Sequence, residues 1–380
     1  MNNKYRNHLC IVFAIEHYNP LGIIRSLGEA GVNPVYIAVN GRVRVASASK
    51  YISKCFPVES VEEGYDVLIK EFGDVYESEE KPLIFCSDDK TIGFLDQQYN
   101  SLKDRFLFYN AGKNGRINEF MDKKKILDLA VKHGVPVLKS RVLMHGEVPD
   151  DLEYPIITKA ISPNSGAWKA DVHICENAEE LKTAYDNIES PEILVQRFIN
   201  KKTEMAIEGF CANHGKDFFG SIQSNYQYVI KGYYSPFMYC KNFDDIDLGK
   251  KLNAMMEEIG YEGIFEIEFL VDQDDSLYFL EFNFRNSTWS YASTVAGMPL
   301  PMLWADGMID GVMHKDIYRK VPDGFTAMVE PIDYAKRVKE GKIDLAQWLV
   351  DFKLANCGYY FNSDDIEPWK ICVKNWDKLG

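Results

Sequence analysis

The stretch of sequence that decides the fold is I-F-E-I-E-F-L-V at residues 264–271, followed after the acidic turn 272–275 by L-Y-F-L-E-F-N-F-R at 277–285. Around the acidic positions polar residues alternate with apolar ones, which predicts two strands. The turn between them is short. The two strands are therefore expected to pair as an antiparallel hairpin.

This hairpin places several metal-binding residue types on one face. Glu281, Asn283 and Arg285 share a face of the second strand, and Glu268 of the first strand can lie opposite them. Two carboxylates and an amide oxygen, with positions left for phosphate oxygens, suit Mg²⁺ in a nucleotide site. The alternative is a solvated face of alternating charge. Because apolar residues fill every second position, we expect Glu268, Glu281 and Asn283 to bind metal.

Two lysines upstream lie at positions suited to phosphate binding. Lys123 begins a predicted helix at 122–131, and Lys159 ends the apolar strand P-I-I-T-K at 155–159. A lysine that points inward from a buried strand needs an anionic partner. For either residue, a side chain that extends along the surface to water is an equally good interpretation.

The N-terminal third alternates short apolar strands with helices. Strands are predicted at 9–15, 34–39 and 82–86, and helices at 20–30 and 91–100. Short buried strands that alternate with helices indicate a doubly wound parallel sheet. The first fold class expected is therefore an α/β domain of this kind.

Ligands of such sheets lie at the carboxyl ends of the strands. Glu16 and Asp88 follow two of the predicted strands, and with Arg25 they are candidates for contact with a substrate. Helix capping explains Glu16 and Asp88 equally well. The sequence contains neither G-x-G-x-x-G nor G-x-x-x-x-G-K-[ST], which argues against a Rossmann dehydrogenase and a Walker-type nucleotide site.

The middle of the chain predicts antiparallel strands with few helices. Helices are expected at 179–188 and 245–259. The strands expected here are 154–161, 170–175, 193–198, 205–212, 218–223 and 226–230. The first two flank a long polar hairpin tip at 162–169.

Composition excludes several function classes. Lys and Arg total 43 against 57 for Asp and Glu, and a net charge of -14 argues against nucleic acid as a partner. No apolar run approaches the ~20 residues needed to cross a bilayer. The eight cysteines form no C-x-x-C pair, which indicates reduced thiols. We expect a soluble cytoplasmic protein with no membrane partner.

The order of these pieces resembles the ATP-grasp superfamily. The resemblance rests on D-K at 122–123, G-V-P at 134–136, P-I-I-T-K at 155–159, I-L-V-Q-R-F-I at 193–199, G-Y-E-G-I-F-E-I-E-F at 260–269 and the strand at 277–285. Within the superfamily the chain looks most like carboxylate-amine ligases related to D-aspartate ligase and short carbamoyl-phosphate-synthase-like proteins. That narrower likeness rests on P-L-G-I-I-R-S-L-G at 20–28, S-A-S-K-Y at 47–51 and D-D-I-E-P at 364–368.

The resemblance implies an α/β doubly wound domain followed by an α+β ATP-grasp fold with antiparallel sheets. The implied units are a Rossmann-like domain at 1–112, a small lid subdomain at 113–200, a large subdomain with the metal site at 201–325 and a C-terminal extension at 326–380.

The resemblance also implies roles for individual residues. Lys123 and Lys159 would contact ATP phosphates under a lid at 162–169, and Glu204 would meet the ribose. The adenine edge would meet a hinge formed by Gln196, Arg197, Phe198 and Ile199. Glu268, Glu281 and Asn283 would hold one or two Mg²⁺ ions, for which Mn²⁺ can substitute. Lys159 and Arg285 would be catalytic, with Arg285 facing the acyl phosphate or the carboxylate being activated.

The activity implied is that of a ligase that joins a small-molecule carboxylate to an amine. ATP would phosphorylate the acid, and the amine would attack the acyl phosphate to form an amide, with release of ADP and phosphate. A homodimer is compatible with this reading. The alternatives are an ATP-binding regulatory protein without ligase activity and an ATP-grasp carboxylase.

Overall fold

The N-terminal domain is the predicted parallel sheet. The computed structural model describes residues 8–74, 76–77, 80–161, 171–230, 235–314 and 318–379. In the described residues the sheet has five parallel strands in the order β3-β2-β1-β4-β5. The elements are β1 (Cys10–Ile15), α1 (Tyr18–Glu29), β2 (Val35–Val39), β3 (Lys54–Val58), α2 (Val61–Phe72), β4 (Leu83–Phe85), α3 (Asp89–Gln97), α4 (Tyr99–Leu102) and β5 (Leu107–Phe108).

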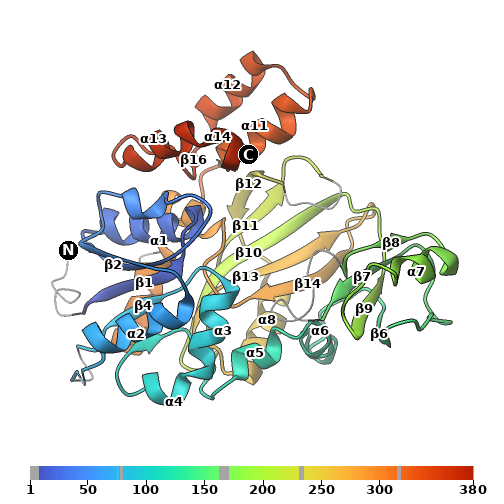
Figure 1. The fold of residues 1–380 in the computed structure, drawn as a ribbon, viewed down its shortest axis with the longest axis horizontal. Helices are drawn as coiled ribbons and strands as arrows, with labels where there is room; N and C mark the ends of the chain where they lie inside the picture. Colours follow the sequence, from blue (N-terminus) through green and yellow to red (C-terminus); the bar gives the residue numbers. More distant parts are fainter. Residues whose placement is uncertain are drawn as a thin grey trace.

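Helices cover both faces of this sheet, as a doubly wound fold requires. β1 and β2 are almost entirely buried, which explains their continuous apolar sequence. α1 packs on β1 from one side and also contacts α10 (Leu300–Asp310), while α2 and α3 pack together on the other side (Figure 1). The predicted strands and helices of this region are confirmed, and β3 and α2 are additional.

The small subdomain is a four-stranded sheet in the order β6-β9-β7-β8 with helices beside it. Its elements are α5 (Arg116–Phe120), α6 (Lys123–Lys132), β6 (Ser140–Met144), β7 (Ile156–Ala160), β8 (Ile174–Cys175), α7 (Ala178–Ala184) and β9 (Glu192–Arg197). Ile156 of β7, Cys175 of β8, Leu181 of α7 and Val195 of β9 belong to an apolar cluster of their own, whereas α5 and α6 pack into the main core. The sheet and α7 therefore have a packing cluster apart from the main core.

The hairpin expected at 154–175 is shorter than predicted. β8 has only two residues. Before it, the Thr158 hydroxyl donates to Asp171 O at 2.6 Å and accepts from His173 N at 2.9 Å, and the Thr158 backbone amide donates to His173 O at 2.9 Å. The predicted tip at 162–169 lies outside the described residues.

A mostly antiparallel seven-stranded sheet carries the central hairpin. Its order is β14-β13-β10-β11-β12-β15-β16, and only β15 and β16 pair in parallel. The elements are β10 (Thr203–Ala212), β11 (Asp217–Tyr226), β12 (Phe237–Asn242), α8 (Ile246–Ile259), β13 (Gly263–Val271), β14 (Leu277–Asn283), α9 (Ser290–Val295) and α10. The strand predicted at 226–230 is wrong: β11 runs unbroken to Tyr226, and its antiparallel partner is β12, which the sequence analysis missed.

The C-terminal segment joins this sheet and then returns to the N-terminal domain. Its elements are β15 (Thr326–Met328), α11 (Glu330–Tyr334), the π-helix η5 (Ala335–Lys339), α12 (Leu345–Leu354), β16 (Cys357–Gly358), α13 (Glu367–Lys374) and α14 (Trp376–Leu379). The buried Glu330 carboxylate accepts hydrogen bonds from the backbone amides of Tyr359, Tyr360 and Phe361. In Figure 1 these helices sit above the two larger sheets.

The sequence also predicted reduced cysteines and no membrane-spanning helix. All eight cysteines are free thiols, and only Cys55 is partly exposed. Within the described ranges, no helix combines the length and the apolar character that a membrane span needs.

Candidate functional site

The carboxylates of the central hairpin lie opposite one another in the expected register. Glu268 pairs with Glu281 across β13 and β14, and the next pair along is Glu266 with Asn283. The Asn283 Nδ2 donates to Glu266 Oε2 at 2.8 Å and to Glu268 Oε1 at 3.0 Å. Burial raises the pKa of Glu268 well above its usual value, and the carboxylates of Glu266 and Glu281 raise it further. The face is therefore acidic around Glu268.

These residues fit part of a magnesium site. In the described ranges, no three His, Cys, Asp or Glu side chains are grouped so that they could hold a metal ion alone. Glu268 and Glu281 supply two opposed carboxylates, which is the partial donor set that phosphate oxygens complete in nucleotide-bound Mg²⁺. The Asn283 oxygen accepts from Arg285 Nη2 at 3.1 Å, so its amide must turn over before that oxygen can face the carboxylates.

The two predicted lysines lie on either side of Glu281. Lys123 follows Asp122, whose side chain caps α6, and its Nζ is 4.0 Å from Glu281 Oε2. Lys159 is on β7, where the pairing with β9 places it diagonally from Gln196, and its Nζ donates to Gln196 Oε1 at 3.1 Å. Desolvation lowers the pKa of Lys159 to about 8, although the Glu281 carboxylate acts in the opposite direction. Both lysines therefore point toward the acidic face rather than away from it.

The predicted hinge lies at the end of β9. Gln196 and Ile199 are buried, whereas the Arg197 side chain is exposed. The backbone amide of Arg197 donates to Lys139 O, and that of Phe198 donates to Pro155 O at 2.8 Å. Two amides of the predicted hinge are thus already bonded within the protein. An adenine ring would have to contact the other backbone groups of this segment.

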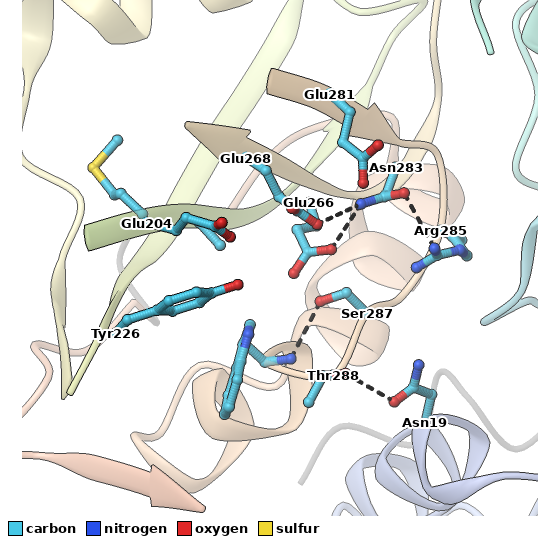
Figure 2. A pocket seen from close by; sticks show the side chains of 13 residues that line it. Asn19, Glu204, Tyr226, Glu266, Glu268, Glu281, Asn283, Arg285, Ser287 and Thr288 are labelled. Carbon is cyan, nitrogen blue, oxygen red and sulfur yellow. Dashed lines mark hydrogen bonds between the residues drawn. The ribbon is translucent and has the colours of Figure 1, made fainter. Parts of the chain in front are cut away.

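Glu204 is the second residue of β10. Its carboxylate accepts a hydrogen bond from Lys201 Nζ and is largely buried. Burial raises the pKa of Tyr226 well above its usual value, and the Glu204 carboxylate raises it further. Figure 2 shows these two residues together on one side of a cavity, away from Arg285.

That cavity has a volume of about 260 Å³ and runs from Glu204 to Arg285. Arg285 follows β14, and its Nε donates to Asp89 Oδ1 at 2.7 Å and its Nη2 to Asp89 Oδ2 at 3.1 Å. The wall beside it is completed by Asn19 from α1, whose Oδ1 accepts from the Thr288 hydroxyl at 3.3 Å (Figure 2). The far end of the cavity is therefore built by two domains.

Some residues near the site were given no role by the sequence analysis. Glu266 belongs to the central hairpin, and alternation along E-I-E puts it on the same face as Glu268. Glu208 is a second carboxylate, after Glu204, in the largely apolar strand β10. It is fully buried and accepts from the hydroxyls of Ser287 and Ser290 at 2.7 Å. Asn19 and Asp89 belong to the stretches 16–19 and 87–89, which were predicted to lie at the carboxyl ends of strands, whereas Thr288 had no comparable local signal.

The three substrate-contact candidates of the N-terminal domain do not line the cavity. Glu16 accepts from the backbone and hydroxyl of Ser47. Asp88 caps α3 and accepts from Ile15 N, so the capping interpretation is correct. Arg25 is completely buried and holds Asp365 at 3.0 Å.

Part of the chain is similar to a known protein family. Residues 118–305 match the family described as "Carbamoyl-phosphate synthase L chain, ATP binding domain". The chain is 26% identical over 153 residues to the propionyl-CoA carboxylase alpha chain of Ruegeria pomeroyi, covering 37% of this chain and 22% of that one. It is 28% identical over 174 residues to biotin carboxylase 2 of Bacillus subtilis, covering 40% and 37%. The matches span less than two fifths of those relatives.

Solved structures resemble almost the whole chain. N5-carboxyaminoimidazole synthetase from Staphylococcus aureus superposes with a TM-score of 0.62 at 13% identity, covering 88% of this chain and 86% of that one. L-amino acid ligase from Bacillus licheniformis gives a TM-score of 0.60 at 14% identity, covering 83% and 78%. Biotin carboxylase from Campylobacter jejuni gives 0.61 at 18% identity, covering 82% and 73%. At these identities the likeness establishes the fold.

Proposed function

We propose that the protein is an ATP-dependent carboxylate-amine ligase of the ATP-grasp type that forms an amide through an acyl phosphate, because residues 118–305 match the ATP-binding domain of carbamoyl-phosphate synthase. The observation that carries the proposal is the distribution of charged groups along one cavity. Glu204 lies at one end and Arg285 at the other, and the opposed carboxylates Glu268 and Glu281, with lysines nearby, line the wall between them (Figure 2). A nucleotide at the first end would present its terminal phosphate toward an acid at the second.

The nucleotide end can be assigned to particular groups. In the proposal, Lys123 and Lys159 contact the phosphates, the segment 196–199 meets the adenine and Glu204 meets the ribose. The two lysines face the same carboxylate, so they remain close to the acidic face without any bound anion. Charge-assisted contacts of this kind are strong and specific for phosphate.

Glu268 and Glu281, with Asn283 after its amide turns, would hold magnesium. The ion, when bound, neutralises charge on the phosphates during an in-line transfer. The protein's own part is to hold these carboxylates opposite each other on paired strands. This explains why a buried carboxylate such as Glu268 is kept in a position that disfavours its charge.

Arg285 would orient the acid. A carboxylate oxygen must approach the terminal phosphate, and several anions then share a small volume. The guanidinium offsets that charge and fixes the direction of attack. After phosphorylation the acyl carbon is attacked by the amine nitrogen, the carbon-oxygen bond to phosphate breaks, and phosphate leaves.

A carboxylase is the second candidate, because the curated relatives named above are carboxylases. It would activate bicarbonate in the same cavity. The discriminating observation is which small molecules stimulate ADP formation: bicarbonate for a carboxylase, or an organic acid together with an amine for a ligase.

The test is a screen for phosphate release with ATP and magnesium, using a panel of amino acids and sugar acids crossed with amines. We expect phosphate release to require an acid, and hydroxylamine to yield the hydroxamate of that acid when the amine is withheld. Arg285→Ala should lose most of this trapping and still bind ATP. The Glu281→Gln variant serves as the matched inactive control.

Three results would count against the proposal. Stimulation by bicarbonate alone would favour the carboxylase. ATP binding with no turnover for any acid would favour a regulatory protein. Phosphate release that needs an acid but yields no hydroxamate would exclude the acyl phosphate.

A further inference from the structure

The guanidinium at the far end of the cavity already holds a carboxylate. Asp89 contacts Arg285 through two parallel hydrogen bonds, Nε to Oδ1 at 2.7 Å and Nη2 to Oδ2 at 3.1 Å. This is the fork geometry in which arginine binds a free carboxylate. Asp89 is the first residue of α3 in the N-terminal domain, whereas Arg285 follows β14. The contact thus bridges two domains at the wall of the cavity.

A second Arg-Asp pair in the same molecule, Arg25 with Asp365, has a purely structural role and serves for comparison. The side chains of Arg25 and Asp365 are 0% and 1% exposed, and all three guanidinium nitrogens of Arg25 are bonded within the protein. The side chains of Arg285 and Asp89 are 15% and 31% exposed. Solvent therefore reaches Asp89, and a small solute can reach it too.

The charges around the exposed pair favour exchange of partners. The guanidinium of Arg285 stays charged, as arginine does in proteins. Asp89 would have no other close cation in the described residues if Arg285 turned away.

We propose that Asp89 occupies the place of the acid substrate's carboxylate on Arg285, and that the displaced Asp89 then binds the ammonium group of the second substrate. The assignment of the ligands as an acid and an amine rests on the proposed ligase function. The exchange replaces one ion pair by two, because Arg285 gains a carboxylate while Asp89 gains an ammonium. It also places the two reacting molecules on neighbouring protein groups, which is the main requirement for their reaction.

The first test uses simple probes and needs no turnover. Isotope-labelled acetate is titrated by NMR into the full-length protein, into Asp89→Asn and into Glu62→Gln. Glu62 also carries a charge in the first turn of a helix of the same domain, but it is exposed and does not line the cavity, so it controls for charge and helix effects. Acetate should bind Asp89→Asn several-fold more tightly than the other two. Equal affinity for all three would overturn the exchange.

The same titration tests the ammonium site. With acetate saturating, methylammonium should bind the unaltered protein and Glu62→Gln more tightly than without acetate, and this gain should be lost in Asp89→Asn. Asp89→Glu keeps the charge, so acetate should still tighten methylammonium binding in this variant. It also provides a charged control in case the Asn variant folds poorly. A gain that survives in Asp89→Asn would show that the amine binds elsewhere.

Steady-state kinetics supplies a second, independent readout. In Asp89→Asn the KM for the acid should fall in the hydroxamate assay, while the KM for the amine should rise by about ten- to a hundredfold, as expected for loss of a charged hydrogen bond. A merely structural role would move both constants in the same direction. Binding results as predicted without any turnover would leave the exchange intact and reject the ligase function.

Discussion

The two ends of the cavity handle charge in opposite ways. At the nucleotide end, Glu268 and Glu281 face each other with only an amide nitrogen and two lysines to offset them, and the pKa of Glu268 is raised. At the acceptor end, Arg285 and Asp89 neutralise each other directly. The nucleotide end is thus prepared for an added cation, whereas the acceptor end must open an existing ion pair before it binds a charged substrate.

The largest effect is expected from a substitution at the nucleotide end of the cavity. Glu281→Gln removes one of the two opposed carboxylates, and we expect magnesium-dependent ADP formation to fall by roughly a hundred- to a thousandfold, since a bound metal ion contributes several kcal/mol to the transition state. Thermal unfolding should change little, because the side chain is partly exposed. ADP assays at saturating magnesium provide the measurement, and near-normal turnover would remove Glu281 from the metal site.

The next prediction separates the architectural Arg-Asp pair from the exposed one. Asp365→Asn leaves Arg25 buried without its charged partner, so the free energy of unfolding should fall by about 3 to 5 kcal/mol. Asp89→Asn should cost much less, because its pair is partly exposed. Urea unfolding of both variants measures the difference, and equal losses would contradict the distinction.

Lys159 provides a smaller effect on nucleotide affinity. Lys159→Ala should weaken ATP binding by about ten- to a hundredfold, which corresponds to roughly 1.5 to 3 kcal/mol for a lost charge-assisted contact. Calorimetry gives the affinity directly. An unchanged value would mean that Lys159 extends to water instead of holding phosphate.

The smallest effect is a pH dependence of the same contact. The pKa of Lys159 is lowered to about 8, so below pH 8 the amine is charged and ATP affinity should be constant. Above pH 8 the free protein must first take up a proton, and affinity should fall by up to about tenfold per pH unit. Titrations without magnesium isolate this effect. Lys159→Arg should abolish the pH dependence, because arginine stays charged.

How much the sequence could predict also differs between the two ends. The hairpin ties Glu268 to Glu281 through a short turn and a period of two, so their opposition followed from local rules. The lysines could be placed because each stands at the boundary of a predicted element. Asp89 and Arg285 are 196 residues apart, and their contact depends on how the two domains pack.

The C-terminal segment illustrates the same limit. Its sequence indicated little, yet Tyr359 packs against Tyr18 at 5.8 Å and Trp289 at 5.5 Å between ring centroids, directly behind the acceptor end. Two stretches behind the narrower family likeness, around Arg25 and Asp365, meet there in one buried ion pair. These short motifs are far apart in the chain, and their shared structural role becomes visible only in the fold.

The central claim is that the acid is phosphorylated before the amine attacks. The most direct measurement follows a heavy oxygen isotope placed in the carboxylate of an acid that stimulates ADP release. The account predicts that one labelled oxygen appears in the released phosphate for each amide formed, because the carbon-oxygen bond to phosphate breaks when the amine attacks. Amide formation with no label in the phosphate would contradict it.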